Sequence, residues 1–412
     1  MMAPAAQLLE MKSLTLLGST GSIGVNTLDV VRQNSHLYRV YALVAGYNVD
    51  AILQQIIEFR PKVAVLATSQ GMHRLAAGLS DSGLPRPNWP ELAFGAAARV
   101  DAATAPEVDM VVSAIVGVAG LEATYEALRR GKRVGLANKE VLVSGGRLVM
   151  DAVRRSGAEL LPIDSEHNGV HQCLRAGNRD QVSRLILTAS GGPFRNTPKE
   201  AMALVTPAQA LNHPTWKMGK RITIDCATLM NKGFEVIEAC WLFGFAASQV
   251  DVVIHPQSTV HAMIEYSDGS VLAQIAATDM RMPIQYALTW PERWQAPVPK
   301  IDWSQPRHWD FAPPDFDRFP LLKLAYQCQE AGASATCTLN AADEVAVESF
   351  LAGEIGFPGI AALVEETLSR MPNRQPHTVG DILEIDKESR ALARELAGRQ
   401  TAGAAQAVPV RV

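Results

Sequence analysis

Short apolar runs alternate with amphipathic stretches over the first third of the chain. The runs have the length of buried strands, and the stretches between them space their apolar residues as helices do. Because strands that alternate with helices form βαβ units, the pattern predicts an α/β fold with a doubly wound parallel sheet. The predicted strands are 13–17, 39–45, 63–67, 109–115, 133–137 and 159–163, and the predicted helices are 25–33, 51–59, 121–130 and 147–156.

The pattern changes after residue 164, where shorter apolar runs lie between loops rich in Gly and Pro. Strands are expected at 184–188, 222–225, 251–254, 260–266 and 270–276. The last two flank Asp268-Gly269, a hairpin turn signal, so an α+β region is predicted. A proline-rich stretch follows, and helical spacing returns at 321–331, 341–351 and 360–370. We therefore expect domains at 12–164, 165–290 and 321–400, with a linker at 291–320.

Composition narrows the class of protein. The 412 residues are 48% hydrophobic, which is enough apolar material for several cores. The 38 basic and 42 acidic residues give a net charge of −4, so no basic field is available for a nucleic acid or an anionic membrane. Five scattered cysteines without a C-x-x-C pair, and no apolar run long enough to span a bilayer, indicate a cytoplasmic protein. An anionic small molecule would have to be held by a local site.

A glycine-rich segment separates the first predicted strand from the first predicted helix. Gly18-Ser-Thr-Gly21-Ser-Ile-Gly24 allows backbone N–H groups to approach a pyrophosphate at the helix N-terminus. This position favours a Rossmann-like nucleotide site over a purely structural turn. The second strand ends at Ala45-Gly46-Tyr47-Asn48, with no carboxylate to repel a 2′-phosphate. NADP is therefore favoured over NAD.

Two carboxylates follow the last strand of the predicted sheet. Asp164 and Glu166 are spaced i, i+2 at the edge where α/β proteins bind ligands, and a hard divalent cation would relieve their repulsion. A helix N-cap at Asp164 or Ser165 is the alternative. His167 and His171 have a spacing that also suits zinc, although packing or hydrogen bonding is the better reading of His171.

A polar stripe is predicted on a helix further along the chain. Thr228, Asn231, Lys232 and Glu235 fall on one helical face, next to apolar neighbours. The stripe is either a solvated surface or a site for a phosphorylated, metal-chelated sugar.

Two other segments carry polar groups. Ser190-Gly191-Gly192-Pro193 ends a predicted strand and is either a phosphate-binding turn or a plain one. The acidic residues Asp343, Glu344 and Glu348 are expected on a solvated helix face.

Five motifs occur in the order found in the 1-deoxy-D-xylulose 5-phosphate reductoisomerase family, which the chain resembles over residues 12–396. The motifs are Gly18-Ser-Thr-Gly-Ser-Ile-Gly24, Leu136-Ala-Asn-Lys-Glu140, Leu161-Pro-Ile-Asp-Ser-Glu-His167, Ser190-Gly-Gly-Pro-Phe194 and the run from Met218 to Glu235. Leu339-Asn-Ala-Ala-Asp-Glu344 is also similar to the family.

The resemblance implies conversion of 1-deoxy-D-xylulose 5-phosphate to 2-C-methyl-D-erythritol 4-phosphate in the non-mevalonate isoprenoid pathway. It implies NADPH, a divalent cation (Mg²⁺, Mn²⁺ or Co²⁺) and a homodimer. The first domain would bind NADPH, the second would hold substrate, metal and the dimer contacts, and the third would be a small helical domain.

The resemblance also implies roles for individual residues. The metal ligands would be Asp164, Glu166 and Glu235, and the catalytic residues Lys139, Glu166 and Glu235. Substrate would be bound by Lys139, Ser165, Glu166, Ser190, His213, Asn231, Lys232 and Glu235. NADPH would be bound by Thr20, Gly21, Ser22, Ile23, Gly46, Asn48, Asn138, Glu140 and Gly219. The loop 213–218, with Trp216 as an apolar cover, would close over the substrate.

Two positions depart from the family's pattern. Cys226 stands where relatives usually carry a phosphate-binding Ser, and Tyr47 stands where a Lys or another polar residue is common. Two other functions remain to be distinguished: a metal-independent NADP-dependent reductase of a phosphorylated aldehyde, and a non-catalytic dinucleotide sensor.

Overall fold

The computed structural model describes residues 11–214 and 218–406. The chain forms two compact units. Unit 1 contains the described residues up to Asn138, together with Asp151–Asn168 and Asp279–Pro299. Unit 2 contains Lys139–Met150, Gly169–Thr278 and the described residues from Lys300 onward. The division into three domains and a linker stays a prediction.

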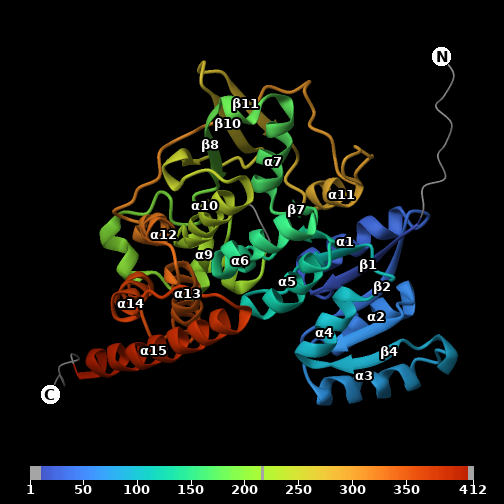
Figure 1. The fold of residues 1–412 in the computed structure, drawn as a ribbon. Helices are drawn as coiled ribbons and strands as arrows, with labels where there is room; N and C mark the ends of the chain where they lie inside the picture. Colours follow the sequence, from blue (N-terminus) through green and yellow to red (C-terminus); the bar gives the residue numbers. More distant parts are fainter. Residues whose placement is uncertain (1–10, 215–217, 407–412) are drawn as a thin grey trace. The chain divides into compact units, whose positions relative to one another are not determined.

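Unit 1 is built on a seven-stranded parallel sheet with the strand order β4-β3-β2-β1-β5-β6-β7 (Figure 1). Strands β2 to β4 lie on one side of β1 and strands β5 to β7 on the other, so the direction of winding changes between β1 and β5. Doubly wound sheets bind ligands at this point, next to the segments that follow β1 and β5. The strands are β1 Lys12–Leu17, β2 Tyr38–Val44, β3 Val63–Leu66, β4 Glu91–Phe94, β5 Met110–Ser113, β6 Arg133–Leu136 and β7 Leu160–Pro162.

Helices connect these strands, as the predicted βαβ pattern requires. They are α1 Ser22–Gln33, α2 Val49–Phe59, α3 Ser69–Asp81, α4 Gly95–Thr104, α5 Leu121–Arg129 and α6 Glu140–Ser156. Helices α1 to α5 lie in this unit, and α6 has residues in both units. Helix α11 Arg281–Thr289 also belongs to unit 1, and its Gln285 accepts a hydrogen bond of 3.1 Å from Asn34 at the end of α1. The doubly wound prediction is confirmed. The prediction did not include α3, β4 or α4, and β4 is a short strand with no fully buried residue.

Unit 2 contains a four-stranded mixed sheet in the order β11-β10-β8-β9. Strands β8 Val182–Ala189 and β9 Val250–Ile254 are parallel, and β10 Val260–Tyr266 pairs antiparallel with β8 and with β11 Val271–Ile275. The predicted hairpin is present, with Gly269 at φ +86° in its turn.

The remaining helices complete unit 2. They are α8 Pro207–Ala210, α9 Lys220–Ala227, α10 Met230–Phe243, α12 Pro320–Ala331, α13 Ala335–Leu351, α14 Phe357–Arg370 and α15 Val379–Gln406. Helix α7 Ser165–Cys173 has residues in both units. Helices α12–α15 pack together and α12 also packs on α10, which confirms the helical C-terminal region (Figure 1).

The strand expected at 222–225 is wrong, because these residues lie inside α9. The β-branched sequence Ile-Thr-Ile favours a strand locally, but burial of Thr223 and Ile224 decides in favour of the helix. The Thr223 hydroxyl donates a hydrogen bond of 2.8 Å to the Gly219 carbonyl one turn earlier, so the helix also satisfies its polar side chain.

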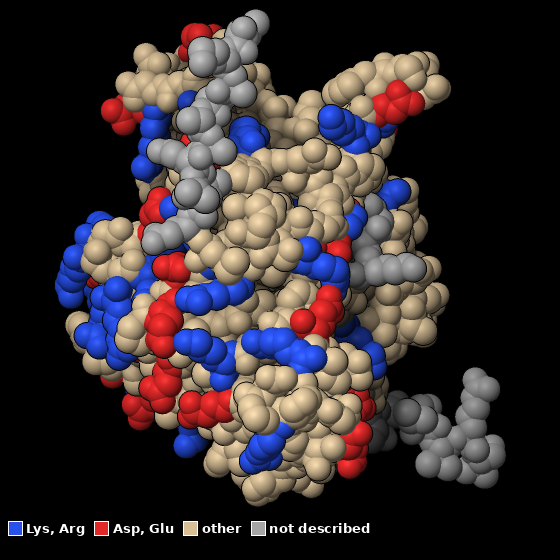
Figure 2. Space-filling model, turned by 90° about the vertical axis from the view of Figure 1, so that its right-hand side faces the viewer, with Lys and Arg blue, Asp and Glu red and all other residues tan. Residues whose placement is uncertain are grey.

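The surface fits the modest net charge. On the face in Figure 2, acidic and basic side chains are interspersed among neutral ones. Within the described residues, no helix is both long and apolar enough to cross a membrane.

Candidate active site

The glycine-rich turn of unit 1 brings the backbone close to neighbouring segments. Gly18 has φ +93°, and a Cβ atom there would lie 2.4 Å from the Ala114 carbonyl oxygen. A Cβ on Gly24 would lie 2.3 Å from the Ser19 carbonyl oxygen. Gly21 is the N-cap of α1, and no side chain caps that helix. The turn therefore presents the positive end of α1 and its first N–H groups to an anion.

Other predicted cofactor residues follow neighbouring strands of the same sheet. Gly46 and Asn48 are exposed after β2, where Asn48 accepts a hydrogen bond of 3.1 Å from the Ala51 N–H and caps α2. Asn138 is buried after β6 and donates to the Gly117 carbonyl at 3.0 Å. Its Oδ1 atom is buried without a hydrogen-bond partner among the described residues, so it can accept a bond from a ligand. Thr20, Ser22 and Ile23 lie in the glycine-rich turn itself, and Tyr47 is 79% exposed.

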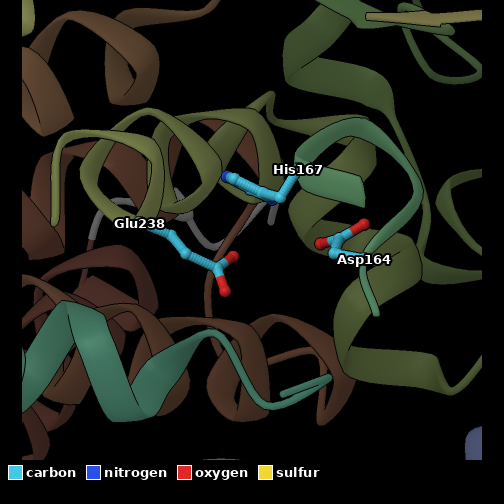
Figure 3. A group of neighbouring side chains, drawn as sticks. All are labelled: Asp164, His167 and Glu238. Carbon is cyan, nitrogen blue, oxygen red and sulfur yellow. The ribbon is translucent and has the colours of Figure 1, made fainter. Parts of the chain in front are cut away.

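The acidic pair lies where β7 leads into α7. One carboxylate oxygen of Asp164 lies within 4.8 Å of one of Glu166, and the Ser165 hydroxyl donates to Glu166 Oε2 at 2.6 Å. Figure 3 shows Asp164 and the buried His167, which follow one another along this segment, and Glu238 on α10. Carboxylate oxygens in this arrangement suit a hard divalent cation. Among the described residues, the possible metal-ligand groups do not include His171, and burial lowers the pKa of His171 to about 4.

The polar stripe of α10 forms a buried ionic group in unit 2. The Lys139 ammonium donates to Asn231 Oδ1 at 2.8 Å and lies 3.4 Å from Glu235 Oε1. Asn231 Nδ2 donates to the same Glu235 oxygen at 2.6 Å, and Lys232 forms an ion pair with Glu235 Oε2. Lys139, Lys232 and Glu235 are all buried, so the alternative of a solvated helix face is wrong. Lys139 and Lys232 thus both approach the Glu235 carboxylate inside unit 2.

The turn after β8 lies beside α9. Gly191 and Gly192 have φ +81° and +65°, and a Cβ on Gly192 would lie 2.6 Å from the Cys226 carbonyl oxygen. The Ser190 hydroxyl is 3.1 Å from His213 Nε2, and burial lowers the pKa of His213. Burial also raises the pKa of the Cys226 thiol, which keeps it un-ionised. Trp216 of the predicted lid lies outside the described residues.

The expectation of a solvated acidic face on α13 is wrong. Asp343 is fully buried and Glu344 is half-buried, while only Glu348 is exposed. Their partner is Arg221 on α9, which also donates to Glu140 Oε1 at 2.8 Å. Arg221 was missed because its segment was expected to be a strand. Once the helix is recognised, the i, i+4 spacing of Arg221 and Asp225 is the signal that identifies it.

Three family models match successive parts of the chain. The model described as 1-deoxy-D-xylulose 5-phosphate reductoisomerase matches residues 14–146, and its C-terminal domain model matches residues 160–243. The DXP reductoisomerase C-terminal domain model matches residues 275–392. A curated reductoisomerase from Solibacter usitatus is 74% identical and aligns with 95% of this chain and 99% of its own length. The chain belongs to the 1-deoxy-D-xylulose 5-phosphate reductoisomerase family.

Other family members agree over nearly the whole length. The reductoisomerase from Chlorobaculum tepidum is 47% identical and aligns with 94% of this chain and all of its own. The solved reductoisomerase from Zymomonas mobilis in complex with NADPH is 45% identical, has a TM-score of 0.86 and covers 94% of this chain and 99% of that one. A reductoisomerase structure in complex with NADPH, fosmidomycin and magnesium is 40% identical, has a TM-score of 0.88 and covers 94% and 98%.

Proposed function

We propose that this chain converts 1-deoxy-D-xylulose 5-phosphate to 2-C-methyl-D-erythritol 4-phosphate with NADPH and a divalent cation, in non-mevalonate isoprenoid synthesis. Its family membership and the NADPH and magnesium complexes of its relatives support the reaction. The ionic set Lys139, Asn231, Lys232 and Glu235, whose three charged members are buried, is the observation that carries the proposal. Such a set is costly to bury unless a ligand uses it.

The glycine-rich turn fits the pyrophosphate of NADPH. Gly18 and Gly24 leave no room for side chains of their own, and the N-terminus of α1, which no side chain caps, favours negative charge. We assign the cofactor site to Thr20, Gly21, Ser22, Ile23, Gly46, Asn48 and Asn138 of unit 1 and to Glu140 and Gly219 of unit 2.

The donor chemistry fits a divalent cation. Asp164 and Glu166 offer carboxylate oxygens within 4.8 Å of each other, and we assign Glu235 as the third ligand. Oxygen donors alone favour Mg²⁺ or Mn²⁺ over zinc. When bound, the cation would polarise the substrate's adjacent oxygens for carbon-skeleton rearrangement, and NADPH would supply the hydride that reduces the resulting aldehyde.

The chain's own side chains orient the substrate. Lys139, Ser165 and Glu166 are assigned to its reacting end, where the buried Lys139 ammonium is held by Asn231 and can stabilise developing negative charge on oxygen. Ser190, His213, Asn231 and Lys232 are assigned to its phosphate. Lys232 contributes a compact charge, and Ser190 a hydroxyl aligned by His213.

One assay separates this function from its rivals. Deoxyxylulose phosphate is added to the purified protein, and the loss of NADPH absorbance is followed with Mg²⁺, with a chelator, and in the Asp164→Asn variant. We expect turnover only in the wild type with the cation. Turnover that survives the chelator and the substitution would identify a metal-independent reductase. NADPH binding without turnover would identify a dinucleotide sensor.

We also propose that the chain is a homodimer and works in the cytoplasm. Edge strand β11 exposes Val271 (47%) and Leu272 (38%), which is the kind of apolar sheet edge that a second copy can cover. The five free thiols fit a reducing compartment. Light scattering of the wild type should give the dimer mass, whereas Leu272→Lys should shift the protein towards the monomer. A wild-type monomer would contradict the dimer.

A further inference from the structure

A buried ionic cluster in unit 2 surrounds the guanidinium of Arg221. Arg221 Nη1 donates to Glu140 Oε1 at 2.8 Å and to Glu344 Oε1 at 2.9 Å, and Nη2 donates to Asn340 Oδ1 at 2.8 Å. One side chain of α9 thereby contacts the start of α6 and the middle of α13. Arg is the residue suited to this arrangement, because its planar fork directs several donors at once.

Among the described residues, the ion pairs of this cluster join more carboxyl groups than cations. The charged groups that face one another are Glu140 on α6, Arg221 and Asp225 on α9, Asp343 and Glu344 on α13, and Asp386 and Arg390 on α15. If all of these groups were ionised, five negative charges would face two positive ones. Such an excess is very costly in a buried environment, so the cluster must retain protons.

The hydrogen bonds indicate where a proton lies. Glu140 and Glu344 accept direct bonds from Arg221, and Asp386 accepts one of 2.7 Å from Arg390. Asp343 and Asp225 lie farther away, at 3.7 Å and 3.6 Å from Arg221 nitrogens, which is too far for a hydrogen bond. Both Asp343 oxygens and Asp225 Oδ1 are buried without a donor among the described residues. Their Oδ2 atoms face Nε and Nη2, on one edge of the same guanidinium, and two carboxyl groups can share a hydrogen bond there only when one of them carries a proton.

The environment favours Asp343 as the protonated partner. Burial and the charge of Asp225 raise the pKa of Asp343 well above its usual range. Burial raises the pKa of Asp225 to about 7, against the attraction of Arg221. Arg221 and Arg390 outweigh burial at Glu344 and lower its pKa, so that group stays ionised.

We propose that Asp343 is a neutral carboxylic acid that donates a hydrogen bond to Asp225, and that this pair holds Arg221 as a positioning residue for Glu140. Helix α13 is thereby tied to α9 and to the start of α6. Glu140 directly follows Lys139, and Cys226 in the last turn of α9 lies beside the Ser190 turn. Arg221 thus connects the helical region to both assigned ends of the substrate site.

Isosteric amides test the proton directly. In Asp343→Asn, the amide N–H replaces the acid O–H, so the bond to Asp225 is kept at every pH. In the wild type, the raised pKa means that stability is fully present below the unfolded value of about 4 and is lost as pH rises towards the folded value. The Tm of Asp343→Asn minus that of the wild type should therefore increase by a few degrees between about pH 5 and about pH 8.

Matched variants and a second readout complete the test. Asp225→Ala removes the acceptor and should lower the Tm at both pH values, whereas Glu348→Gln on the exposed face of α13 should leave the Tm unchanged at both. The infrared C=O band of a protonated carboxyl group should be present in the wild type at neutral pH and absent in Asp343→Asn. A Tm difference that is constant with pH, or a wild type without that band, overturns the proposal.

The positioning role rests on the proposed function and is tested separately. Arg221→Gln should raise the KM for NADPH about tenfold, the effect of losing roughly one charge-assisted hydrogen bond, with a smaller change in kcat. Arg221→Lys should restore part of this loss. An unchanged KM in a folded Arg221→Gln protein would reduce Arg221 to a structural role. An inactive wild type would contradict the proposed function and leave the pH test of Asp343 standing.

Discussion

Glu235 on α10 is held between two buried ammonium groups. Lys139 approaches one of its oxygens at 3.4 Å, and Lys232 pairs with the other. Burying three charges costs more than it returns unless hydrogen bonds satisfy them, and Asn231 donates one such bond to Glu235. The buried Lys232 ammonium is a compact charge that suits a phosphate ester, so we expect this charge to contribute to substrate affinity.

Removal of that charge should weaken substrate binding. We expect Lys232→Gln to raise the KM for the sugar phosphate by about tenfold or more, with a smaller change in kcat, because one charged contact to the phosphate is lost. Lys220→Gln, at an exposed position on α9, is the control and should behave as the wild type. Steady-state kinetics with the sugar phosphate as the varied substrate measure KM and kcat for both variants. Equal loss of kcat and kcat/KM would instead place Lys232 at the reacting end.

Cys226 tests the departure from the family's pattern at the same end. The thiol is un-ionised because burial raises its pKa, and a thiol is a weak hydrogen-bond donor. We expect Cys226→Ser to lower the KM for the sugar phosphate by a factor of about two, since a hydroxyl donates a better bond. Initial-rate measurements on both proteins provide the comparison. An unchanged or higher KM would count against a phosphate contact there.

At the scale of elements, the pattern of apolar residues predicted the strands and helices whose buried positions recur with a regular period. Strands β1, β2 and β6 are buried runs beside amphipathic helices, and their positions agree with the prediction to within one or two residues. The pattern failed at β4, which has no buried run, and at α9, where packing overrides the β-branched sequence. The buried Arg221 cluster was not predictable, because its partners come from helices far apart in the sequence.

The glycine-rich segment 18–24, which leads from β1 into α1, provides a testable prediction at this scale. Gly24→Ala should raise the KM for NADPH at least about tenfold and lower the Tm, because its Cβ would meet backbone oxygens of Ser19 and Gly18 at 2.3 Å and 2.4 Å. The control is Gly71→Ala in α3, where the nearest atom would be 3.4 Å away. That substitution should be neutral or should stabilise the helix by up to about 1 kcal/mol. Equal effects of the two variants on KM would show that the turn tolerates a side chain.

At the scale of the whole molecule, each unit has its own hydrophobic core. The core of unit 1 is formed by its parallel sheet and covering helices, including Ile284 and Leu288 of α11. The core of unit 2 is formed by the mixed sheet, α10 and the C-terminal helices. The assigned NADPH residues belong mainly to the first unit, and the assigned phosphate residues to the second. A ligand of one site should therefore protect one unit far more than the other.

Hydrogen exchange can detect this division. NADPH alone should slow amide exchange at residues 18–24, 45–48 and 136–140. A ligand that binds only the folded state raises the free energy of local opening by about 2.7 kcal/mol when its concentration is a hundred times its Kd. The amides of α14 and α15 should exchange as before, because these helices contain none of the assigned residues. Adding Mg²⁺ and a substrate analogue should extend protection to the Ser190 turn and to α10. If NADPH alone slowed exchange uniformly over both units, the assignment of separate sites would be contradicted. If it protected only α10, the cofactor would bind to unit 2 and the assignment to unit 1 would be wrong.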